Sequence, residues 1–470
     1  MFKPDSTGAH DRSDVTPIAT TTASVGETPP PLPTPRKKLL SNFAITTICV
    51  GATLAALVVI GVATAIIGGL MTSQVHAVQA RPEPQRPAAP AQRPTAPREE
   101  RAAQPAPANN NAGITYRNHK ITTDDGQPVS LHILKIDRSR ADLGFYSAHA
   151  RDKVLAVSFI KDQAAAVPPE VGTAIAGING DFYVRDQPTY AGDPRGLQIM
   201  NGELISAPDT VCVWFDTNGA PHLDEVKGLF YVTWPDGKKT PFGLNQQRRP
   251  NAAVLYTPTL GSSTRASGGS ELVLEKEGNG PWLPLQAGQT YRARVREIST
   301  TGNTKLAPDT MVLSIGAQLL ADVPELKPGT VLQLSTGTTP NLAGVKAAIA
   351  GGPALIKAGQ AFTLKSPPPG APGGYAEASK YQRHPRAAVG WSPSHIYLII
   401  ADGRKPGLSM GMKLAELAEY FVSLGCTDAM NLDGGKSAQL WFNNDIVNDA
   451  VAGEDTVANS LLVIRKPAAR

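Results

Sequence analysis

Four short stretches place polar side chains at the ends of apolar runs, where they could carry chemistry. The first is 176–183, in which an apolar run ends at Asn179, Gly180 and Asp181. Polar groups are costly to bury without partners, and carboxylates and amides at the end of a strand are well placed to point into a cleft. An Asn-Gly turn capped by the Asp side chain is the alternative interpretation.

The second and third stretches combine guanidinium, imidazole and carboxylate groups. Arg383, His384 and Arg386 precede an apolar segment, and the donor fork of arginine suits a phosphate or a carboxylate. Asp402 closes the strongly apolar run 395–400, within the sequence Ala-Asp-Gly-Arg. The alternatives are a solvated basic loop for the second stretch and an Asp-Gly turn for the third.

The fourth stretch, 429–437, is the most informative. Asn431 and Asp433 are two residues apart, so on an extended backbone their side chains share one face. Gly434 and Gly435 permit positive φ and a close approach of a ligand to the backbone. A glycine turn explains the two glycines but not the polar side chains on one face, so we interpret this stretch as part of a functional site.

Together, and in this order, these stretches resemble the phosphodiester glycosidase family. The matching segments are IAGINGDFY (175–183), GGPALI (351–356), RHPRAAVGW (383–391), ADGR (401–404), GMKLAELAEYFVSLGC (411–426), AMNLDGGKSAQL (429–440) and VANSLLV (457–463). The resemblance spans most of 113–465 and is weakest over 216–345. It implies hydrolysis of a sugar-1-phosphodiester, without a required cofactor, in envelope or exported polysaccharide.

The resemblance also implies which residues form the site. The candidate catalytic residues are Asp181, Arg386, Asp402 and Asp433, and the candidate substrate-binding residues are Asn179, Arg383, His384, Asn431, Gly434, Gly435 and Ser437. Arg386, helped by Arg383 or His384, would hold the phosphate as the C1–O bond breaks. Asp433 or Asp181 would act as the nucleophile or would activate water. Lys436 and Ala438 depart from the family pattern, which bears on the substrate.

Two other classes of function are open at this point. Asp181, Asp402 and Asp433 could hold a divalent cation, which would make the protein a metal-dependent phosphodiesterase that breaks the P–O bond. Alternatively, the protein could be a non-catalytic module for glycan binding or envelope assembly. Its candidate sugar-stacking aromatics are Tyr183, Tyr190 and Trp391.

Composition and charge organise the rest of the chain. Among 470 residues the net charge is only +5 and not concentrated in a stripe, which argues against nucleic acid as a partner. Residues 41–75 carry no charge and follow Arg36, Lys37 and Lys38, which predicts a transmembrane anchor with its N-terminus in the cytoplasm. A cleaved signal peptide ending near Val75-His-Ala is the alternative. We expect a disordered tail over 1–40, a Pro/Ala-rich spacer over 76–112 and an exported domain over 113–470.

The exported domain is predicted to be α+β, with a mixed, sheet-rich structure and few helices. The predicted strands are 129–136, 173–179, 210–215, 291–298, 311–315, 331–334, 395–401 and 459–464. The predicted helices are 412–424, whose apolar residues repeat at helical spacing, and 155–166. The segment 216–345 is interpreted as a β-rich insertion.

Cysteine and histidine patterns give little sign of a metal or a disulfide framework. The chain has three cysteines and eight histidines, without the spacing of a zinc site. A disulfide between Cys212 and Cys426 and a pair of buried thiols are both open.

Overall fold

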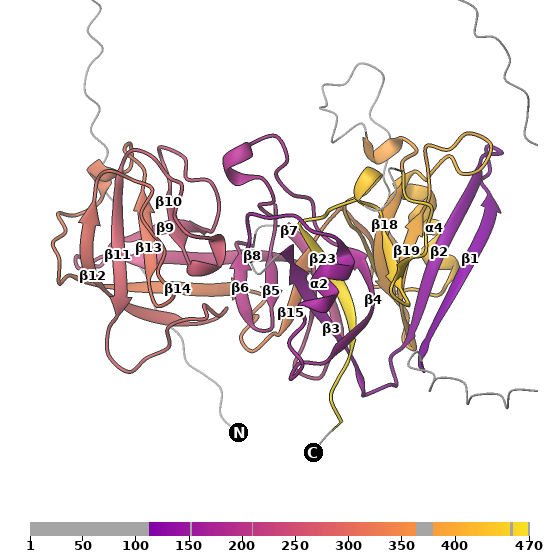
Figure 1. Ribbon diagram of the computed structural model, residues 1–470, viewed down its shortest axis with the longest axis horizontal. Helices are drawn as coiled ribbons and strands as arrows, with labels where there is room; N and C mark the ends of the chain where they lie inside the picture. The colour runs from indigo at the N-terminus through magenta and orange to yellow at the C-terminus, as the bar shows by residue number, and fades with distance from the viewer. Residues whose placement is uncertain (1–111, 151–152, 209, 363–378, 452–454, 469–470) are drawn as a thin grey trace, which may run out of the picture. The chain divides into compact units, whose positions relative to one another are not determined.

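The computed structural model describes residues 112–150, 153–208, 210–362, 379–451 and 455–468 (Figure 1). The predicted tail, the anchor and all but the last residue of the spacer lie outside these ranges. Among the described residues, no helix has the length and apolar character that crossing a membrane requires.

Two antiparallel sheets carry the polar stretches of the sequence. The order of the seven-stranded sheet is β1 (Ile114–Thr122), β2 (Pro128–Asp137), β19 (His395–Ala401), β18 (Arg386–Trp391), β20 (Asp428–Asn431), β16 (Ala354–Lys357) and β17 (Gln360–Ala361). The order of the five-stranded sheet is β22 (Asp445–Ile446), β21 (Leu440–Phe442), β4 (Thr173–Asn179), β23 (Asn459–Arg465) and β3 (Leu143–His149).

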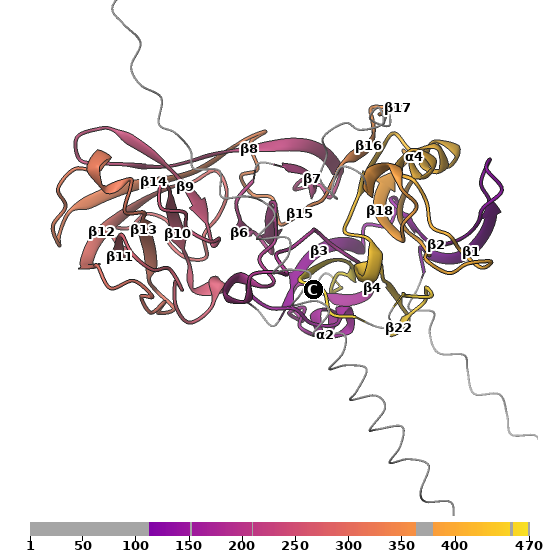
Figure 2. The same ribbon diagram turned by 90° about the horizontal axis from the view of Figure 1, so that it is seen from above.

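Strands with continuous apolar runs are buried on both faces, and this builds four layers. In β19, Leu398 and Ile400 pack between the two sheets, whereas Tyr397 and Ile399 pack with the helix α4 (Leu414–Ser423). Each fully buried side chain of this kind contributes about 1.5–3 kcal/mol. The helix α2 (Ile160–Ala165) packs in the same way on the outer face of the five-stranded sheet. Figure 2 shows α4 beside β16 and β18, and α2 beside β4.

The helix α4 forms because its apolar residues make one stripe. Leu414, Leu417 and Phe421 are buried, and Gly425, with φ of +73°, follows the end of the helix. Phe421 lies so close to Gly390 of β18 that a Cβ there would be 2.7 Å from its ring. The glycine therefore lets the helix approach the sheet.

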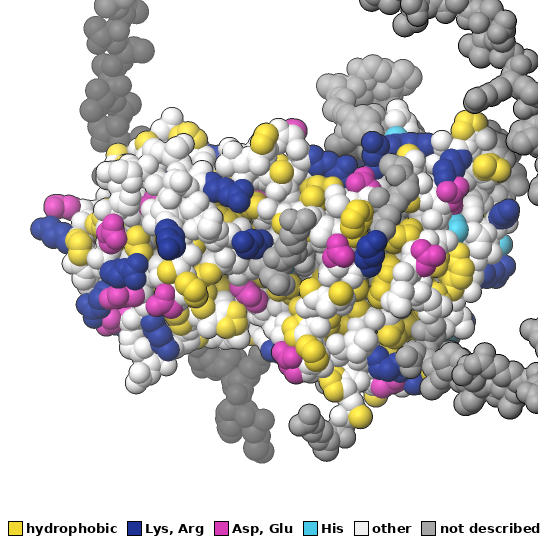
Figure 3. All heavy atoms as spheres, viewed as in Figure 1, with side chains coloured by type: hydrophobic (Ala, Val, Ile, Leu, Met, Phe, Trp, Pro, Cys, Tyr) yellow, Lys and Arg dark blue, Asp and Glu magenta, His cyan; other side chains and the backbone are white. Residues whose placement is uncertain are grey.

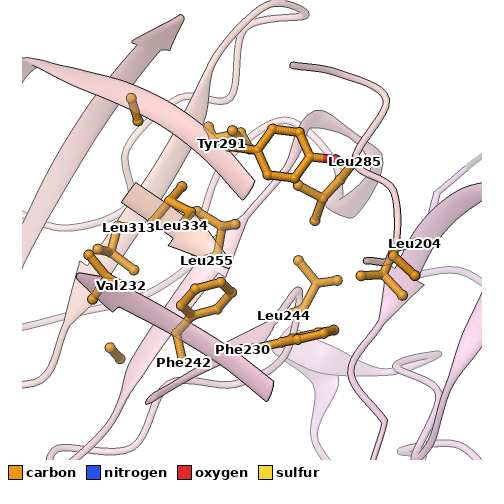
Figure 4. Packing of buried hydrophobic residues seen from close by; sticks show 14 of the residues in the cluster. Leu204, Phe230, Val232, Phe242, Leu244, Leu255, Leu285, Tyr291, Leu313 and Leu334 are labelled. Carbon is orange, nitrogen blue, oxygen red and sulfur yellow. The ribbon is translucent and has the colours of Figure 1, made fainter. Parts of the chain in front are cut away.

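A third sheet contains eleven strands, most of them in the segment predicted as β-rich. The order is β14 (Val331–Thr339), β12 (Thr290–Ser299), β11 (Ser270–Lys276), β13 (Met311–Ile315), β10 (Ala253–Tyr256), β9 (Lys239–Leu244), β8 (Pro221–Thr233), β7 (Thr210–Phe215), β15 (Ala347–Ala350), β5 (Gln198–Met200) and β6 (Glu203–Ser206). Because β14 also pairs with β8, the strands from β8 to β14 close into a ring. Figure 4 shows apolar side chains filling it, including Phe230, Phe242 and Tyr291.

The secondary structure confirms most predictions and corrects two. The strands 173–179, 210–215, 311–315 and 395–401 have the predicted bounds. The helix predicted over 155–166 begins only at Ile160, because Ser158 forms a β-bridge with Val457 instead. The prediction of a sheet-rich domain with few helices is confirmed, but the described part is mostly β rather than α+β.

The two described cysteines are buried free thiols. Cys212 lies in the core of the eleven-stranded sheet, and Cys426 lies under α4. The interpretation as buried thiols is therefore confirmed, and the disulfide is excluded.

Candidate active site

The polar stretches meet at one end of the two smaller sheets. In the seven-stranded sheet, β18 begins at Arg386 opposite Ala401, where β19 ends, and β20 ends at Asn431 opposite Ala388. In the five-stranded sheet, β4 ends at Asn179. The chain then crosses from β20 to β21, and so from one sheet to the other, through residues 432–439.

Both sheets hold the centre of this crossing, residues 433–437, which we call the glycine loop. On the β4 side, the N–H of Asp433 donates to the carbonyl of Gly180 (3.0 Å). On the β18 side, the N–H of Gly435 donates to the carbonyl of Pro385 (2.9 Å). A Cβ at Gly434 would lie 2.6 Å from that same carbonyl oxygen, so only glycine allows this approach.

Asn179 holds the first residue of the glycine loop and Gln439, two residues beyond its end, rather than facing solvent. Its Nδ2 donates to the carbonyl of Asp433 (2.6 Å), and its Oδ1 accepts from the N–H of Gln439 (3.1 Å). The residue is buried, so both bonds are shielded from water. These contacts make Asn179 a positioning residue.

Asp433 is the one predicted carboxylate of this site that solvent reaches appreciably. Its side chain is 16% exposed, compared with 3% for Asp402. Arg185 places Nη2 3.4 Å from Asp433 Oδ2, donates to Ser437 Oγ and lies 4.5 Å above the ring of Tyr183. Burial raises the pKa of Asp433, whereas Ser437 and Arg185 favour its ionised form. Asp433 is therefore a partly exposed carboxylate held beside a cation.

Asp181 is buried behind Asp433 and holds the neighbouring backbone. Its Oδ1 accepts from the N–H of Phe182 and its Oδ2 from the N–H of Gly196, both at 2.8 Å. Its own N–H donates to Asn459 Oδ1 (2.8 Å). Burial raises the pKa of Asp181 to about 7; the two N–H donors oppose that rise, and the charge of Asp433 adds to it.

A third buried acid, Asp193, was not predicted from the sequence. Within the described part of the chain its Oδ1 has no hydrogen-bond partner. Burial raises the pKa of Asp193 to about 8; Arg195 opposes this rise, and Asp181 adds to it. The sequence Gly-Asp-Pro-Arg-Gly over 192–196 looks like an ordinary turn, so only the burial identifies this residue.

Asp402 reaches the glycine loop only through other residues. Its Oδ2 lies 2.8 Å from His132 Nε2, and His132 Nδ1 lies 2.8 Å from the hydroxyl of Tyr116. Its Oδ1 accepts from Asn448 Nδ2 (3.3 Å), and Asn448 Oδ1 accepts from the N–H of Leu440, just beyond the loop (2.7 Å). The structure thus makes Asp402 part of a buried network that supports the loop.

Arg386 does not present the free guanidinium that the sequence suggested. Its Nε donates to the carbonyl of Met412 (2.9 Å), and its Nη2 donates to the carbonyls of Ser379 (2.6 Å) and Gln382 (2.8 Å). The side chain is buried among these acceptors. These contacts fix the start of β18 against the segments around it.

Arg383 is likewise occupied, by two carboxylates. Its Nη1 and Nη2 donate to the two oxygens of Glu416 at 2.8 and 2.6 Å, and its Nη2 also reaches Asp125 Oδ1 at 2.5 Å. This bidentate pairing is the strong form of an arginine–carboxylate contact. The predicted substrate-binding role of Arg383 therefore has no support in its contacts.

His384 contacts a cation that the sequence analysis did not include in the site. Its Nδ1 lies 3.4 Å from Arg404 Nη2. Burial lowers the pKa of His384, and the charges of Arg386 and Arg404 lower it further, so the neutral imidazole is favoured. Arg404 belongs to the Ala-Asp-Gly-Arg motif, which was the available signal for it.

Asn431 is buried behind the glycine loop. Its Nδ2 donates to the carbonyls of Gly352 (2.9 Å) and Leu432 (2.8 Å). Its buried Oδ1 has no hydrogen-bond partner among the described residues. Across all the residues that the structure describes, there is no group of three or more His, Cys, Asp or Glu side chains that could hold a metal ion.

Comparison with known proteins agrees with the resemblance of the motifs. Residues 288–464 match the model of the family described as phosphodiester glycosidase. This confirms the resemblance and identifies the matched region as part of a hydrolase domain of that class. The match includes Arg386, Asp402 and Asp433 but begins after Asn179 and Asp181. A comparison with curated proteins finds no match.

Solved structures share the fold. A hypothetical protein from Synechocystis is 19% identical with a TM-score of 0.60, over 77% of this chain and 64% of that one. A Burkholderia pseudomallei protein described as exported is 21% identical with a TM-score of 0.55, over 72% and 74% of the two chains. The catalytic domain of zebrafish N-acetylglucosamine-1-phosphodiester alpha-N-acetylglucosaminidase, auto-inhibited by its pro-peptide, aligns over 77% and 86% at 13% identity. Its TM-score of 0.38 is too low to establish a common fold.

Proposed function

We propose that the protein hydrolyses a sugar-1-phosphodiester by breaking the bond between C1 and oxygen. The observation that carries this proposal is the placement of Asp433. It is a partly exposed carboxylate beside Arg185, on a loop that two sheets hold in place, and it lies within the region that matches the phosphodiester glycosidase family.

For this reaction the protein has mainly to stabilise the charges that develop on the sugar and on the phosphate. The phosphate is a good leaving group, so the C1–O electron pair can depart with it without a strong proton donor. Asp433 faces the positive charge that develops on the sugar and either bonds to C1 or removes a proton from the attacking water. Water supplies the hydroxyl of the free sugar. Arg185 stabilises the ionised form of Asp433 before the reaction.

Asn179 and Asp181 fix the backbone on the β4 side of this carboxylate. Asn179 holds the carbonyl of Asp433, and Asp181 holds the backbone of Phe182 and Gly196. Because misplacing a reacting group by about 1 Å can cost roughly 100-fold in rate, such support is a requirement for activity.

The proposed location is outside the cytoplasm, on envelope or exported polysaccharide. The support for this is the uncharged segment 41–75 after Arg36, Lys37 and Lys38, followed by a Pro/Ala-rich spacer. Protease added to intact spheroplasts should then degrade the domain and spare a tag placed before residue 36. Protection of the domain would refute this location.

The reaction is tested with a panel of sugar-1-phosphodiesters in ¹⁸O-labelled water. We expect the label in the free sugar and none in the phosphate. Asp433→Asn should lower kcat/KM by at least about 1,000-fold, in the range found for groups that act on the reacting atoms. Asp445→Asn, a change at an exposed carboxyl of the nearby β22, is the matched control and should retain activity.

The other outcomes separate the alternative functions. Label in the phosphate would refute C–O cleavage, and loss of that activity in a chelator would indicate a metal-dependent phosphodiesterase. Glycan binding without turnover across the panel, unchanged in Asp433→Asn, would indicate a non-catalytic module. Thermal unfolding of each variant establishes that it is folded.

A further inference from the structure

One arginine beside the glycine loop has no carboxylate partner. Arg404 is exposed and forms no ion pair with any of the described residues. Three other arginines around the loop are engaged: Arg383 with Glu416, Arg386 with three carbonyls, and Arg185 with Asp433. A fourth, Arg195, is exposed, and its charge acts on the acids Asp433, Asp181 and Asp193. Arg404 is therefore available to bind an anion.

The backbone holds Arg404 in an uncommon conformation that directs it to the loop. Its φ is +61°, in the left-handed region that few residues other than glycine adopt. A Cβ at the preceding Gly403 would lie 2.7 Å from the nitrogen of Pro385, so this turn is packed closely against the start of β18. Conformations of this kind cluster at functional sites because the surrounding structure must maintain them.

The guanidinium of Arg404 lies next to Gly435, the second glycine of the loop. A Cβ at Gly435 would be 3.3 Å from Arg404 Nη2 and 3.6 Å from its Nη1. His384 Nδ1, 3.4 Å from Nη2, contacts the group from the side, and a neutral imidazole can accept a hydrogen bond there. The absence of a side chain at Gly435 leaves room for the arginine next to the backbone.

The surroundings of Arg404 favour a negatively charged ligand. Lys436 of the glycine loop is also exposed, and the nearest acid in sequence, Asp402, faces His132 instead. On the face in Figure 3, Lys and Arg side chains gather along the upper edge, over β18, β19 and α4. The acids Asp181 and Asp193 are buried on the β4 side of the loop.

We propose that Arg404 binds the phosphate of the substrate, so that the sugar lies at Asp433 and the phosphate lies against the guanidinium next to Gly435. This inference rests on the proposed function. Asp433 and Gly435 are two residues apart, a span of roughly 5–7 Å along the backbone. A single C1–O–P unit can bridge a carboxylate and a guanidinium so placed. As the C1–O bond breaks, its electron pair moves to the phosphate oxygen, and the guanidinium offsets this charge.

The test compares two substrates that share a sugar but differ in the leaving group. One is a sugar-1-phosphodiester, and the other is the neutral p-nitrophenyl glycoside. Arg404→Ala should lower kcat/KM for the phosphodiester by roughly 100-fold and change that for the neutral glycoside less than about threefold. Arg404→Lys should recover part of the loss, because it restores the charge without the donor fork. Lys327→Ala, a change at an exposed lysine outside the glycine loop, is the control and should alter neither value.

A binding measurement makes the test independent of turnover. Titration of the full chain with inorganic phosphate should show at least tenfold weaker binding in Arg404→Ala than in the wild type. Equal losses for both substrates, or unchanged phosphate binding in folded Arg404→Ala protein, would overturn the proposal. If the wild type turns over no phosphodiester, the proposed function fails, whereas phosphate binding lost in Arg404→Ala would still place an anion at Arg404.

Discussion

Replacing Asn179 by alanine should lower the free energy of unfolding and also lower activity, because the glycine loop loses the contact that positions Asp433. The side chain is 1% exposed and makes two hydrogen bonds, to the carbonyl of Asp433 and to the N–H of Gln439. Each bond contributes about 1 kcal/mol, and each buried partner left without a bond costs about as much again. Cavity formation is small for this truncation. We therefore expect a loss of roughly 3–4 kcal/mol in the free energy of unfolding.

The assay is urea unfolding, with activity measured on the same preparations. The midpoint of unfolding should fall while the slope with urea stays unchanged, since the surface exposed on unfolding is the same. The value of kcat/KM should fall about 100-fold as the carboxylate of Asp433 loses its fixed position. Asn218→Ala, at an exposed turn, is the matched control and should change stability by less than about 0.5 kcal/mol.

The comparison of Asn179→Asp with Asn179→Ala separates the two bonds. The aspartate oxygen can still accept from Gln439 but, when ionised, cannot donate to the carbonyl of Asp433. It should therefore lose activity like the alanine variant. If Asn179→Ala unfolds at the same urea concentration as Asn218→Ala and keeps its activity, the idea that this amide positions the loop is refuted.

Two further predictions concern buried titratable groups. The pKa of Asp193 is about 8 in the folded protein and about 4 when unfolded, so its contribution to stability is full below pH 4 and is lost as the pH rises through about 8. Asp193→Asn should flatten the decline in stability between pH 5 and 8, measured by urea unfolding; an unchanged decline would contradict the burial of this carboxyl. Burial raises the pKa of the Cys426 thiol to about 12 and that of Cys212 still further, so both should react with an aromatic disulfide reagent at least 100-fold more slowly in the folded than in the unfolded protein.

Strands could be predicted from the sequence where both of their faces are buried, because such strands are continuous apolar runs. Helices could be predicted where the spacing of apolar residues along the sequence agrees with the packing in the structure. The runs 174–178 and 396–401 are apolar without interruption because both of their faces are covered, and the strands that contain them have the predicted bounds 173–179 and 395–401. The strand β8 mixes charged and apolar residues because its partners change along its length. The helix over 155–166 was predicted too long because Ser158 pairs with Val457, a partner that no local pattern reveals.

The site was predictable in residue type but not in the use of each group. The polar residues that the sequence places at strand ends do lie there: β4 ends at Asn179 and β20 ends at Asn431. It could not show that the donors of Arg386 are directed to carbonyls or that Asp402 is paired with His132, since these partners come from other segments. Arg185 and Asp193 lie in a polar turn segment with no apolar run to mark their burial or contacts. Whether an arginine near the loop can bind a ligand therefore depends on the acceptors that the fold brings to it, which the residue type does not reveal.

The position of β23 also sets the order in which the site is completed during synthesis. This strand lies between β4 and β3, and its Asn459 accepts the N–H of Asp181. A nascent chain that ends before residue 459 contains every other strand of the five-stranded sheet but not the one that joins β3 to β4. The ribosome therefore delivers a central strand after its neighbours, and the carboxylates near β4 are assembled only once that strand is made. Chains truncated at that point should lack enzymatic activity, whatever their length upstream.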